Sequence, residues 1–306
     1  MRVLFVGSSG QLGQELLALI NGDMDLDILN PNSNEFNILN DKLMINYINS
    51  NKPDLVVNLS AYTNVDLAEQ KSNLVMKINF EGVKSLGDIC SSSLIPLIHI
   101  STDYVFGDKS KAPHKINDIH DPKNLYGKSK SLGEKYLSEN CQRIIIIRTA
   151  SLYGLYRKNF FKTFIDILSN KKKIDVVDDQ KISLTWTYDL ALSIYQIINM
   201  IKENYSLKNM DNSTTLHLVN SGFTNWYDVV HRIANFMSKI NKDYSKLVVN
   251  PVSSEEWDAI ALRSNDSRLE FYGMIFGEEL VIPEWDVSLN NALDLYFSGE
   301  DIVKKI

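Results

Sequence analysis

The 306-residue sequence predicts an α/β protein, a doubly wound parallel sheet with a smaller C-terminal lobe. Three observations favour this fold. Over the first ~150 residues, short apolar runs bounded by turn residues alternate with helical patterns, as in parallel sheets that are buried on both faces. A glycine-rich turn joins the first apolar run to the first helical segment. Beyond Asn159 the alternation gives way to helices with short, irregular strands.

This change of pattern predicts two domains. We expect a dinucleotide-binding domain over 1–158 and a mainly substrate-binding lobe over 159–306, with parts of 186–220 returning to the first domain. The net charge of −6 argues against a nucleic-acid or membrane-surface partner. Two cysteines give no disulfide framework and no metal pattern, and no apolar run is long enough for a signal peptide or a membrane span. We therefore expect a cytoplasmic protein.

The first strand, Val3 to Val6, leads directly into a Gly-x-x-Gly-x-x-Gly turn and a helix that reaches Ile20. Glycines let the backbone approach a pyrophosphate, and the free N–H groups at the start of the helix receive its charge. The turn consists of Gly7, two serines, Gly10, Gln11, Leu12 and Gly13. This context predicts a phosphate site for a dinucleotide, although the spacing differs from the commoner Gly-x-Gly-x-x-Gly.

The second strand, Leu26 to Leu29, ends at Asn30. An acidic residue there would suit the ribose 2′-hydroxyl of NADH, and a nearby arginine would suit the 2′-phosphate of NADPH. The sequence supplies neither, so the choice between the two cofactors stays open. A third strand, Leu55 to Leu59, runs into the polar segment 60–66, at the end of the sheet where such folds place their ligands. The pattern over Leu74 to Ser91 predicts a helix that contains Asn79.

The fourth strand, Leu94 to Ile100, ends in Ser-Thr-Asp-Tyr-Val-Phe, and Asp121-Pro122 then introduces a helix that carries Tyr126 and Lys130. Residues four apart share one face of a helix. A cation beside a phenol favours the phenolate, so a hydroxyl with a usual pKa of ~10 could exchange protons near neutrality. Such an exchange is half of a carbonyl reduction, and the glycine turn offers a place for the hydride donor.

The rest of the chain completes the first domain and builds the lobe. Arg143 to Arg148 is the fifth strand, and the apolar patterns beyond it predict further helices and strands. We expect helices over 160–169, 188–201 and 226–238 and after 285, strands over 174–177 and 215–219, a surface loop over 206–212, and few periodic signals over 247–268. The three lysines at 171–173 are expected to form a solvated turn.

Taken in order, these motifs resemble the dTDP-4-dehydrorhamnose reductase family of the extended short-chain dehydrogenases/reductases. The resemblance rests on the Gly7 to Gly13 turn, the Asn58 to Asp66 segment, Ser-Thr-Asp-Tyr-Val-Phe over 101–106, and Tyr-Gly-Lys-Ser-Lys over 126–130. It implies a Rossmann-type fold and reduction, with NADPH or NADH, of the 4-keto group of a nucleotide-diphospho-6-deoxysugar for polysaccharide precursor synthesis. It also implies a nucleotide-sugar partner, and a homodimer is among the assemblies left open.

The resemblance also assigns roles by matching positions. Tyr126 would donate the proton, Lys130 would bind the nicotinamide ribose and lower the pKa of Tyr126, and Thr102 would hydrogen-bond near the reacting oxygen. The cofactor-binding set is completed by Gly7, Gly10, Gln11, Leu12, Gly13, Asn37, Ile38, Ala61, Tyr62, Thr63 and Asn79. The substrate-binding set is Val65, Thr102, Asp103, Tyr104, Ser151 and Arg263, the last because a diphosphate needs cations.

Several positions depart from the family pattern. Ser151 stands where the family commonly carries a tryptophan that lies against the sugar. The family usually has a proline in the turn over 182–185 and another at position 264, and this sequence has neither. Glu15 matches one carboxylate of a magnesium site known in some members, but Tyr188 and Leu295 occupy the other two positions, so we predict no metal. The five histidines show no ligand spacing and are expected to be structural.

Three alternatives remain. A reductase or epimerase of another nucleotide sugar would use the same motifs. A 4,6-dehydratase is disfavoured because Asp103 is followed by Tyr104, whereas that family has a glutamate there. A non-catalytic NAD(P)-binding regulatory subunit, like that of methionine adenosyltransferase, shares the fold, and the intact Thr102, Tyr126 and Lys130 argue against it.

Overall fold

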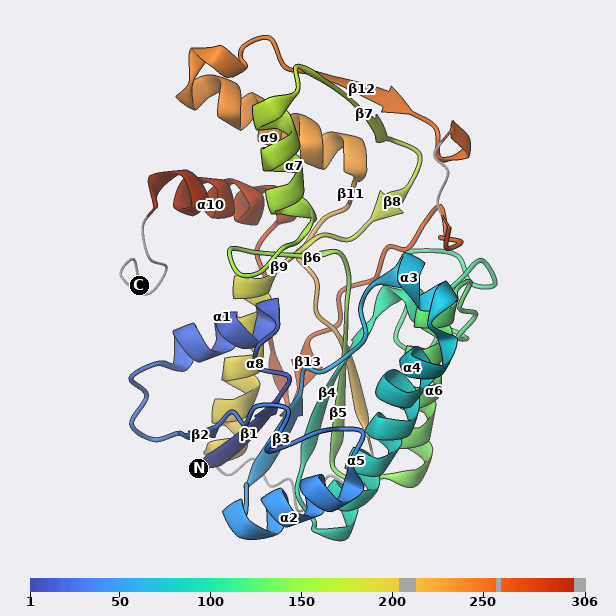
Figure 1. Ribbon diagram of the computed structural model, residues 1–306, viewed down its shortest axis with the longest axis vertical. Coiled ribbons are helices and arrows are strands. Elements are labelled where there is room, and N and C mark those ends of the chain that lie inside the picture. Colours follow the sequence, from blue (N-terminus) through green and yellow to red (C-terminus); the bar gives the residue numbers. More distant parts are fainter. Residues whose placement is uncertain (204–212, 257–259, 300–306) are drawn as a thin grey trace.

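A six-stranded parallel sheet forms the centre of the larger part of the molecule (Figure 1). The computed structural model describes residues 1–203, 213–256 and 260–299, so the loop predicted over 206–212 lies outside the described residues. The strand order is β10-β5-β4-β3-β1-β2, and every pairing between neighbours is parallel. The strands are β1 (Arg2–Val6), β2 (Asp27–Leu29), β3 (Leu55–Asn58), β4 (Leu97–Thr102), β5 (Ile144–Thr149) and β10 (Thr214–His217).

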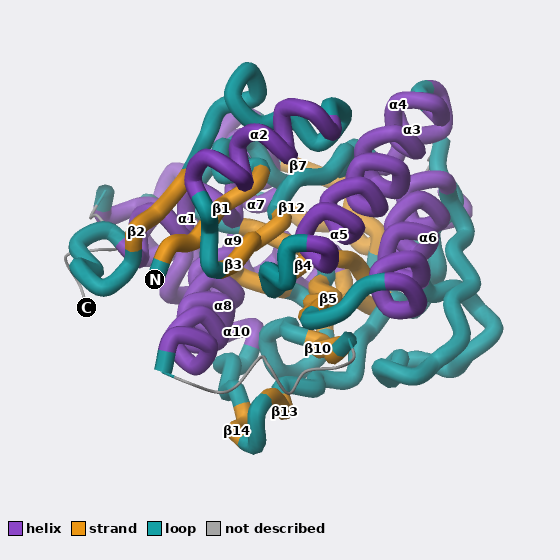
Figure 2. The backbone as a smooth tube through the Cα atoms, turned by 90° about the horizontal axis from the view of Figure 1, so that it is seen from below, coloured by secondary structure: helices purple, strands orange, loops and turns teal. Residues whose placement is uncertain are grey.

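Helices cover both faces of this sheet, which confirms the predicted doubly wound architecture (Figure 2). Alternate residues of each strand enter two different cores. Val3 and Phe5 pack beneath α1 (Gln11–Ile20) and α8 (Thr187–Lys202), whereas Leu4 packs beneath α2 (Asp41–Asn51), α5 (Gly82–Ser92) and α6 (Leu125–Asn140). Strands that are buried on both faces read as continuous apolar runs, which is why the sequence predicts them.

Most predicted boundaries lie within one or two residues of the structure, and two predicted elements differ more. The fourth strand begins at Leu97, not Leu94, because Leu94 has a left-handed φ of 58° in the turn after α5. The single helix predicted over 74–91 is α4 (Ser72–Met76), a π-helical turn (Lys77–Glu81) and α5. The π-helical turn carries Asn79, and π-turns inside helices are frequent at functional sites.

The second lobe has its own apolar core between three helices. These are α7 (Phe160–Asn170), α9 (Trp226–Ile240) and α10 (Trp285–Ser298). Three short pairs lie near them: β6 (Leu152–Tyr153) with β9 (Thr185–Trp186), β7 (Lys173–Val177) with β12 (Val248–Val252), and β8 (Lys181–Ile182) with β11 (Thr224–Asn225). A further pair, β13 (Met274–Ile275) with β14 (Glu278–Glu279), packs instead on the core of the first part, beside β10. Strand β12 lies within the stretch where the sequence offered few periodic signals.

The chain crosses between the two parts more than once. Helix α8 packs against α1, and β10 is the edge strand beside β5, so these two elements contribute to the first part. The short helix α3 (Val65–Gln70) lies on the same side as α6, near the lobe (Figure 1). In the described part of the chain, none of the helices combines the length and apolar character that crossing a bilayer requires.

Candidate active site

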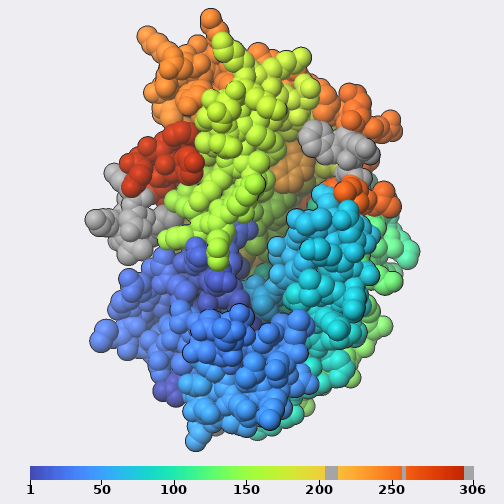
Figure 3. Space-filling view, in the orientation of Figure 1, coloured from blue at the N-terminus to red at the C-terminus, as the bar shows by residue number. Residues whose placement is uncertain are grey.

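A cavity of about 760 Å³ separates the C-terminal edge of the sheet from the lobe. Figure 3 shows the hollow between the yellow-green lobe and the cyan helices. Asp103 and Tyr104 line it from the sheet, and Phe160 and Trp226 line it from the lobe. Lys171 and Lys173 also line this cavity, so the predicted solvated turn in fact borders it. Ligand sites of α/β sheets lie at this edge of the strands.

The glycine turn forms a close-packed cradle at the start of α1. Gly7 has a φ of 81°, and a Cβ there would lie 2.7 Å from Ser60 Cα. A Cβ on Gly13 would lie 2.4 Å from the Ser8 carbonyl oxygen, so neither glycine can carry a side chain without moving backbone. No side chain caps α1, which leaves its first N–H groups for a ligand. These features fit a bound pyrophosphate.

Asn79 holds the loop 61–63 against the helix that carries Tyr126. Its Oδ1 accepts from the Tyr62 backbone N–H at 2.8 Å. Its Nδ2 donates to the Tyr62 backbone carbonyl at 3.1 Å and to Ser129 Oγ at 3.0 Å. The side chain is fully buried and all its groups are engaged. The structure therefore gives Asn79 a positioning role beside the predicted cofactor site. Asn37 Oδ1 caps the following turn through Leu39 N, and Ile38 packs on Gly82.

Helix α6 begins tightly against the turn that follows β4. Asn124 caps it by accepting a hydrogen bond from Gly127 N at 2.8 Å. A Cβ on Gly127 would lie 2.0 Å from the Tyr104 carbonyl oxygen, so only glycine permits this approach. As a result the ring of Tyr126 packs edge-on against Tyr104, with 5.7 Å between the ring centroids.

The structure brings Tyr126 and Thr102 together, as the sequence predicts. The two side chains are hydrogen-bonded to each other, and this interaction acts to lower the pKa of Tyr126. Thr102 Oγ1 donates to Asp103 Oδ1 at 2.9 Å, and Tyr104 N donates to Thr102 Oγ1 at 3.3 Å. Burial raises the pKa of Asp103 to about 6, against the hydrogen bonds from Ser267 and Thr102. Thr102 therefore links Tyr126 to Asp103.

Lys130 corrects the expectation that it lowers the pKa of Tyr126. Burial raises the pKa of Tyr126 above its usual value, and the hydrogen bond with Thr102 opposes this only in part. Lys130 Nζ points elsewhere: it donates to the Ile100 carbonyl at 2.6 Å and lies 3.1 Å from His99 Nε2. Burial also lowers the pKa of Lys130 to about 8, although the charge of Glu134 acts in the opposite direction. Desolvation thus outweighs the hydrogen bond with Thr102 at Tyr126 and the charge of Glu134 at Lys130.

A buried polar network that the sequence did not reveal joins α6 to strands β4 and β5. Arg148 donates to Glu134 Oε2 from Nε at 2.9 Å, and Ser101 Oγ donates to Glu134 Oε1. The same guanidinium lies 2.8 Å from His120 Nε2 and 3.1 Å from His217 Nε2. His120 and His217 are thus both engaged with Arg148 in this network. The only sign of this network in the sequence is an arginine, Arg148, within an otherwise apolar strand. The partners of Arg148 come from distant segments of the chain, so their proximity cannot be predicted from the sequence.

Arg263 lines the cavity and forms an ion pair with Asp66. Its NH2 donates to Asp66 Oδ2 at 3.0 Å, and it also hydrogen-bonds with Tyr104. Burial acts to raise the pKa of Asp66, but the hydrogen bond and charge of Arg263 lower it overall. Val65 starts α3 beside this pair, and Ser151, with a φ of 42°, lines the cavity.

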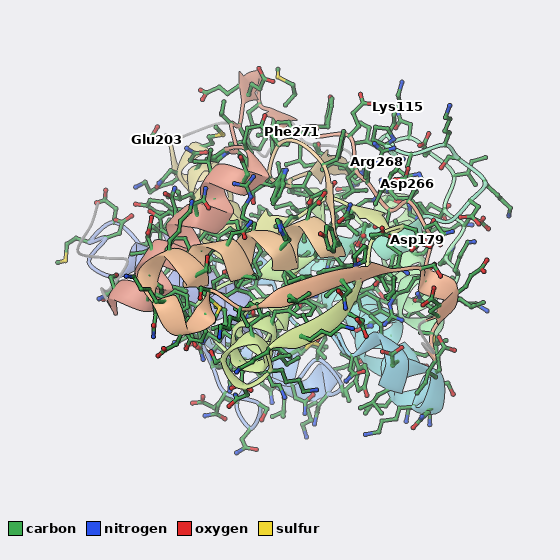
Figure 4. The ribbon with its side chains drawn as sticks, turned by 90° about the horizontal axis from the view of Figure 1, so that it is seen from above. Lys115, Asp179, Glu203, Asp266, Arg268 and Phe271 are labelled. Atoms are coloured by element: carbon green, nitrogen blue, oxygen red, sulfur yellow. The ribbon has the colours of Figure 1, made fainter. Side chains whose placement is uncertain are left out.

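Another cation near the lobe has a different partner. Arg268 forms a two-point ion pair with Asp266, through Nε and NH2 at 2.7 Å each. Figure 4 shows these two residues side by side, with Asp179 in the same region. Arg268 also lies 4.9 Å from the centre of the Phe223 ring. Arg268 therefore stabilises the fold of this edge, whereas Arg263 faces the cavity.

Glu15 lies away from this chemistry. Its Oε2 accepts from Thr187 Oγ1 at 2.7 Å, and burial raises its pKa to about 7. Within 1–203, 213–256 and 260–299, no group of three or more histidine, cysteine, aspartate or glutamate side chains is placed to hold a metal ion.

Known proteins are similar to this chain over most of its length. The RmlD substrate binding domain model matches residues 1–297. A dTDP-4-dehydrorhamnose reductase of Aggregatibacter actinomycetemcomitans is 30% identical over 95% of this chain and 97% of its own. The spore coat polysaccharide biosynthesis protein SpsK of Bacillus subtilis is 33% identical over 74% of this chain and 76% of its own.

Solved structures agree with these matches. A dTDP-4-dehydrorhamnose reductase of Clostridium acetobutylicum has a TM-score of 0.85 at 31% identity, covering 96% of this chain and 99% of that one. The Bacillus anthracis enzyme, solved in complex with NADP, has a TM-score of 0.84 at 29% identity and covers 96% and 98%. The chain belongs to the family described by the RmlD substrate binding domain.

Proposed function

We propose that the protein catalyses NAD(P)H-dependent reduction of the 4-keto group of a nucleotide-diphospho-6-deoxysugar, as in the conversion of dTDP-4-dehydrorhamnose to dTDP-L-rhamnose. The observation that carries this proposal is the hydrogen bond between Tyr126 and Thr102 at a turn whose next residues line the large cavity. The Aggregatibacter and Clostridium relatives bear the name of this activity. Two buried free cysteines, Cys90 and Cys141, fit the cytoplasmic setting that we propose.

The site supports proton donation to a reduced carbonyl. A cofactor held by the glycine turn would supply the hydride. Because burial raises its pKa, Tyr126 keeps its proton at neutral pH and has it available for the substrate oxygen. Thr102 interacts with the same hydroxyl and is itself held in place by donating to Asp103. A substrate oxygen within reach of both hydroxyls would gain a hydrogen bond as its negative charge develops.

The remainder of the cavity suits a nucleotide diphosphate. Cations line it although the chain as a whole has a net charge of −6. A diphosphate is recognised by such convergent cations, with the guanidinium fork of arginine the best match in shape. The cations are Lys123, Lys171, Lys173 and Arg263. Phe160 and Trp226 pack edge-on, with 4.9 Å between ring centroids, and offer apolar surface for a base or sugar.

The test is oxidation of NADPH or NADH on addition of dTDP-4-dehydro-6-deoxy-L-mannose, followed by identification of the product. Consumption of one cofactor per sugar reduced supports the proposal. A regulatory subunit would bind the cofactor and consume none with any keto-sugar. A reductase of another nucleotide sugar would consume it only with a different keto-sugar, and a dehydratase would act on a sugar that lacks the 4-keto group.

A further inference from the structure

The amino group of Lys130 has unusual neighbours for a buried cation. Its side chain is only 1% exposed, and its two hydrogen-bond partners are the Ile100 carbonyl at 2.6 Å and His99 Nε2 at 3.1 Å. A carbonyl oxygen only accepts, so Lys130 must donate to Ile100. An imidazole nitrogen donates or accepts according to its tautomer. The direction of the second hydrogen bond therefore depends on what holds the other side of His99.

Asn58 holds that other side and fixes the tautomer. Asn58 and His99 are register partners on neighbouring strands, and both side chains are fully buried. Asn58 Oδ1 accepts from Ser60 N at 3.1 Å and from Ser60 Oγ at 2.6 Å. Because a backbone N–H can only donate, the group that faces Ser60 must be the amide oxygen. The amide nitrogen then faces His99 Nδ1, at 3.1 Å, and donates to it.

The direction of the Asn58–His99 hydrogen bond determines the protonation state of Lys130. Burial, with the charge of Lys130, holds the pKa of His99 well below 6.5, so the imidazole is neutral and carries one N–H. With Nδ1 accepting from Asn58, that proton is on Nε2 and points at Lys130 Nζ. An ammonium has three N–H bonds and no acceptor, whereas a neutral amine accepts one hydrogen bond and still donates to Ile100.

The charged groups around Lys130 do not reverse this preference. On α6, Tyr126 is an uncharged hydroxyl, and Glu134 is held by Arg148 from β5 and by Ser101 from β4. After β4, Asp103 is engaged by Thr102 and Ser267 and hydrogen-bonds with neither nitrogen of this pair. The described residues thus give the Lys130 amino group no acidic hydrogen-bond partner.

We propose that Asn58 and His99 are positioning residues that couple the protonation of Lys130 to the tautomer of His99. In the arrangement seen here, His99 Nε2–H donates to a neutral Lys130 amine. Lys130 becomes an ammonium when the imidazole proton is carried on Nδ1 and the Asn58 amide turns over, which gives up the hydrogen bond from Ser60 N. One proton enters in total, and the imidazole keeps one throughout. The inference deepens the proposed reduction, in which Lys130 holds the cofactor ribose.

The tautomer of His99 can be observed directly by NMR of protein carrying ¹⁵N-labelled histidine, titrated from pH 6 to 10. Since the pKa of Lys130 is about 8, we expect the Nδ1–H tautomer well below pH 8 and the Nε2–H tautomer well above it, without a charged imidazole at either end. His217 is the internal control. Its Nδ1 faces the Glu270 carbonyl at 3.0 Å and must carry a proton throughout. A single His99 tautomer across this range in the wild type would overturn the proposal.

Asn58→Asp provides the second measurement. A carboxylate accepts from Ser60 on one side and from His99 Nδ1–H on the other, so the variant should show the Nδ1–H tautomer at every pH. It should also move the alkaline limb of kcat/KM upward by about one pH unit, because Lys130 then remains an ammonium for longer. A variant that titrates like the wild type contradicts the coupling. If Asn58→Asp does not fold, the wild-type titration decides alone. The tautomer needs no turnover, so its outcome is separate from that of the sugar assay.

Discussion

Replacing Gly127 by alanine tests whether the close approach of α6 to the turn after β4 positions the reacting hydroxyl. The new Cβ would lie 2.0 Å from the Tyr104 carbonyl oxygen and 3.2 Å from Pro122 Cβ. An ordinary contact begins near 3.4 Å, so α6 and the turn must separate by more than an ångström. Tyr126 and Thr102 lie on opposite sides of this contact, and their hydrogen bond should lengthen or break.

A displacement of that size at a reacting centre lowers the rate by about 10²-fold, and overpacking of this kind lowers the free energy of unfolding by about 1–3 kcal/mol. The assay is steady-state reduction of the keto-sugar, with cofactor affinity and thermal unfolding measured on the same samples. Lys128→Ala is the matched control, because Lys128 is the next residue on α6 and is exposed. Wild-type kcat in a folded Gly127→Ala protein would refute the positioning argument.

Three further changes have defined expectations. Thr102→Val removes the hydroxyl that hydrogen-bonds with Tyr126 and should lower kcat by about 10²-fold with cofactor affinity retained, measured by steady-state kinetics and cofactor titration; unchanged kcat contradicts it. Arg263→Ala should raise the KM for the sugar about tenfold or more, while Arg232→Ala, whose arginine pairs with Asp286 outside the cavity, should leave it unchanged; equal KM values count against diphosphate contact. Glu15 has a folded pKa of about 7, raised from 4.5, so its stabilising contribution is present below pH 4.5 and is lost as pH rises through 7. In the wild type this should lower the free energy of unfolding between pH 5 and pH 8 by on the order of 3 kcal/mol, and Glu15→Gln should remove that decrease. Chemical denaturation at the two pH values measures it, and an unaltered pH dependence in the variant argues against this origin.

The parallel sheet could be predicted because its strands are buried on both faces and are therefore uniformly apolar. The lobe was harder to predict from sequence. Strand β12 is paired only with β7 and contains Pro251, so it lacks both alternation and a continuous apolar run. The boundary errors have local causes: Leu94 adopts a left-handed conformation, and Asn79 lies in a π-helical turn that a helical pattern does not reveal.

The reacting pair was predictable because Tyr126 and Thr102 lie at positions that the fold brings to one edge. The orientation of Lys130 was not. It depends on the register that places Asn58 beside His99, and hydropathy patterns do not specify that register between strands. Placement of Tyr126 and Lys130 on one helix suggested direct electrostatic coupling. In the structure, burial sets the direction of the pKa shift at both groups, and the amino group of Lys130 contacts His99.

The most direct test of the account compares wild type with Tyr126→Phe in the oxidation of NADPH or NADH by dTDP-4-dehydro-6-deoxy-L-mannose. Phenylalanine keeps the ring contact with Tyr104 and removes only the hydroxyl that hydrogen-bonds with Thr102. We predict turnover by the wild type and its near-complete loss in the variant, with cofactor affinity changed by less than about tenfold, because the glycine turn is untouched. Turnover at the wild-type rate in Tyr126→Phe would contradict the assignment of Tyr126 as the proton donor.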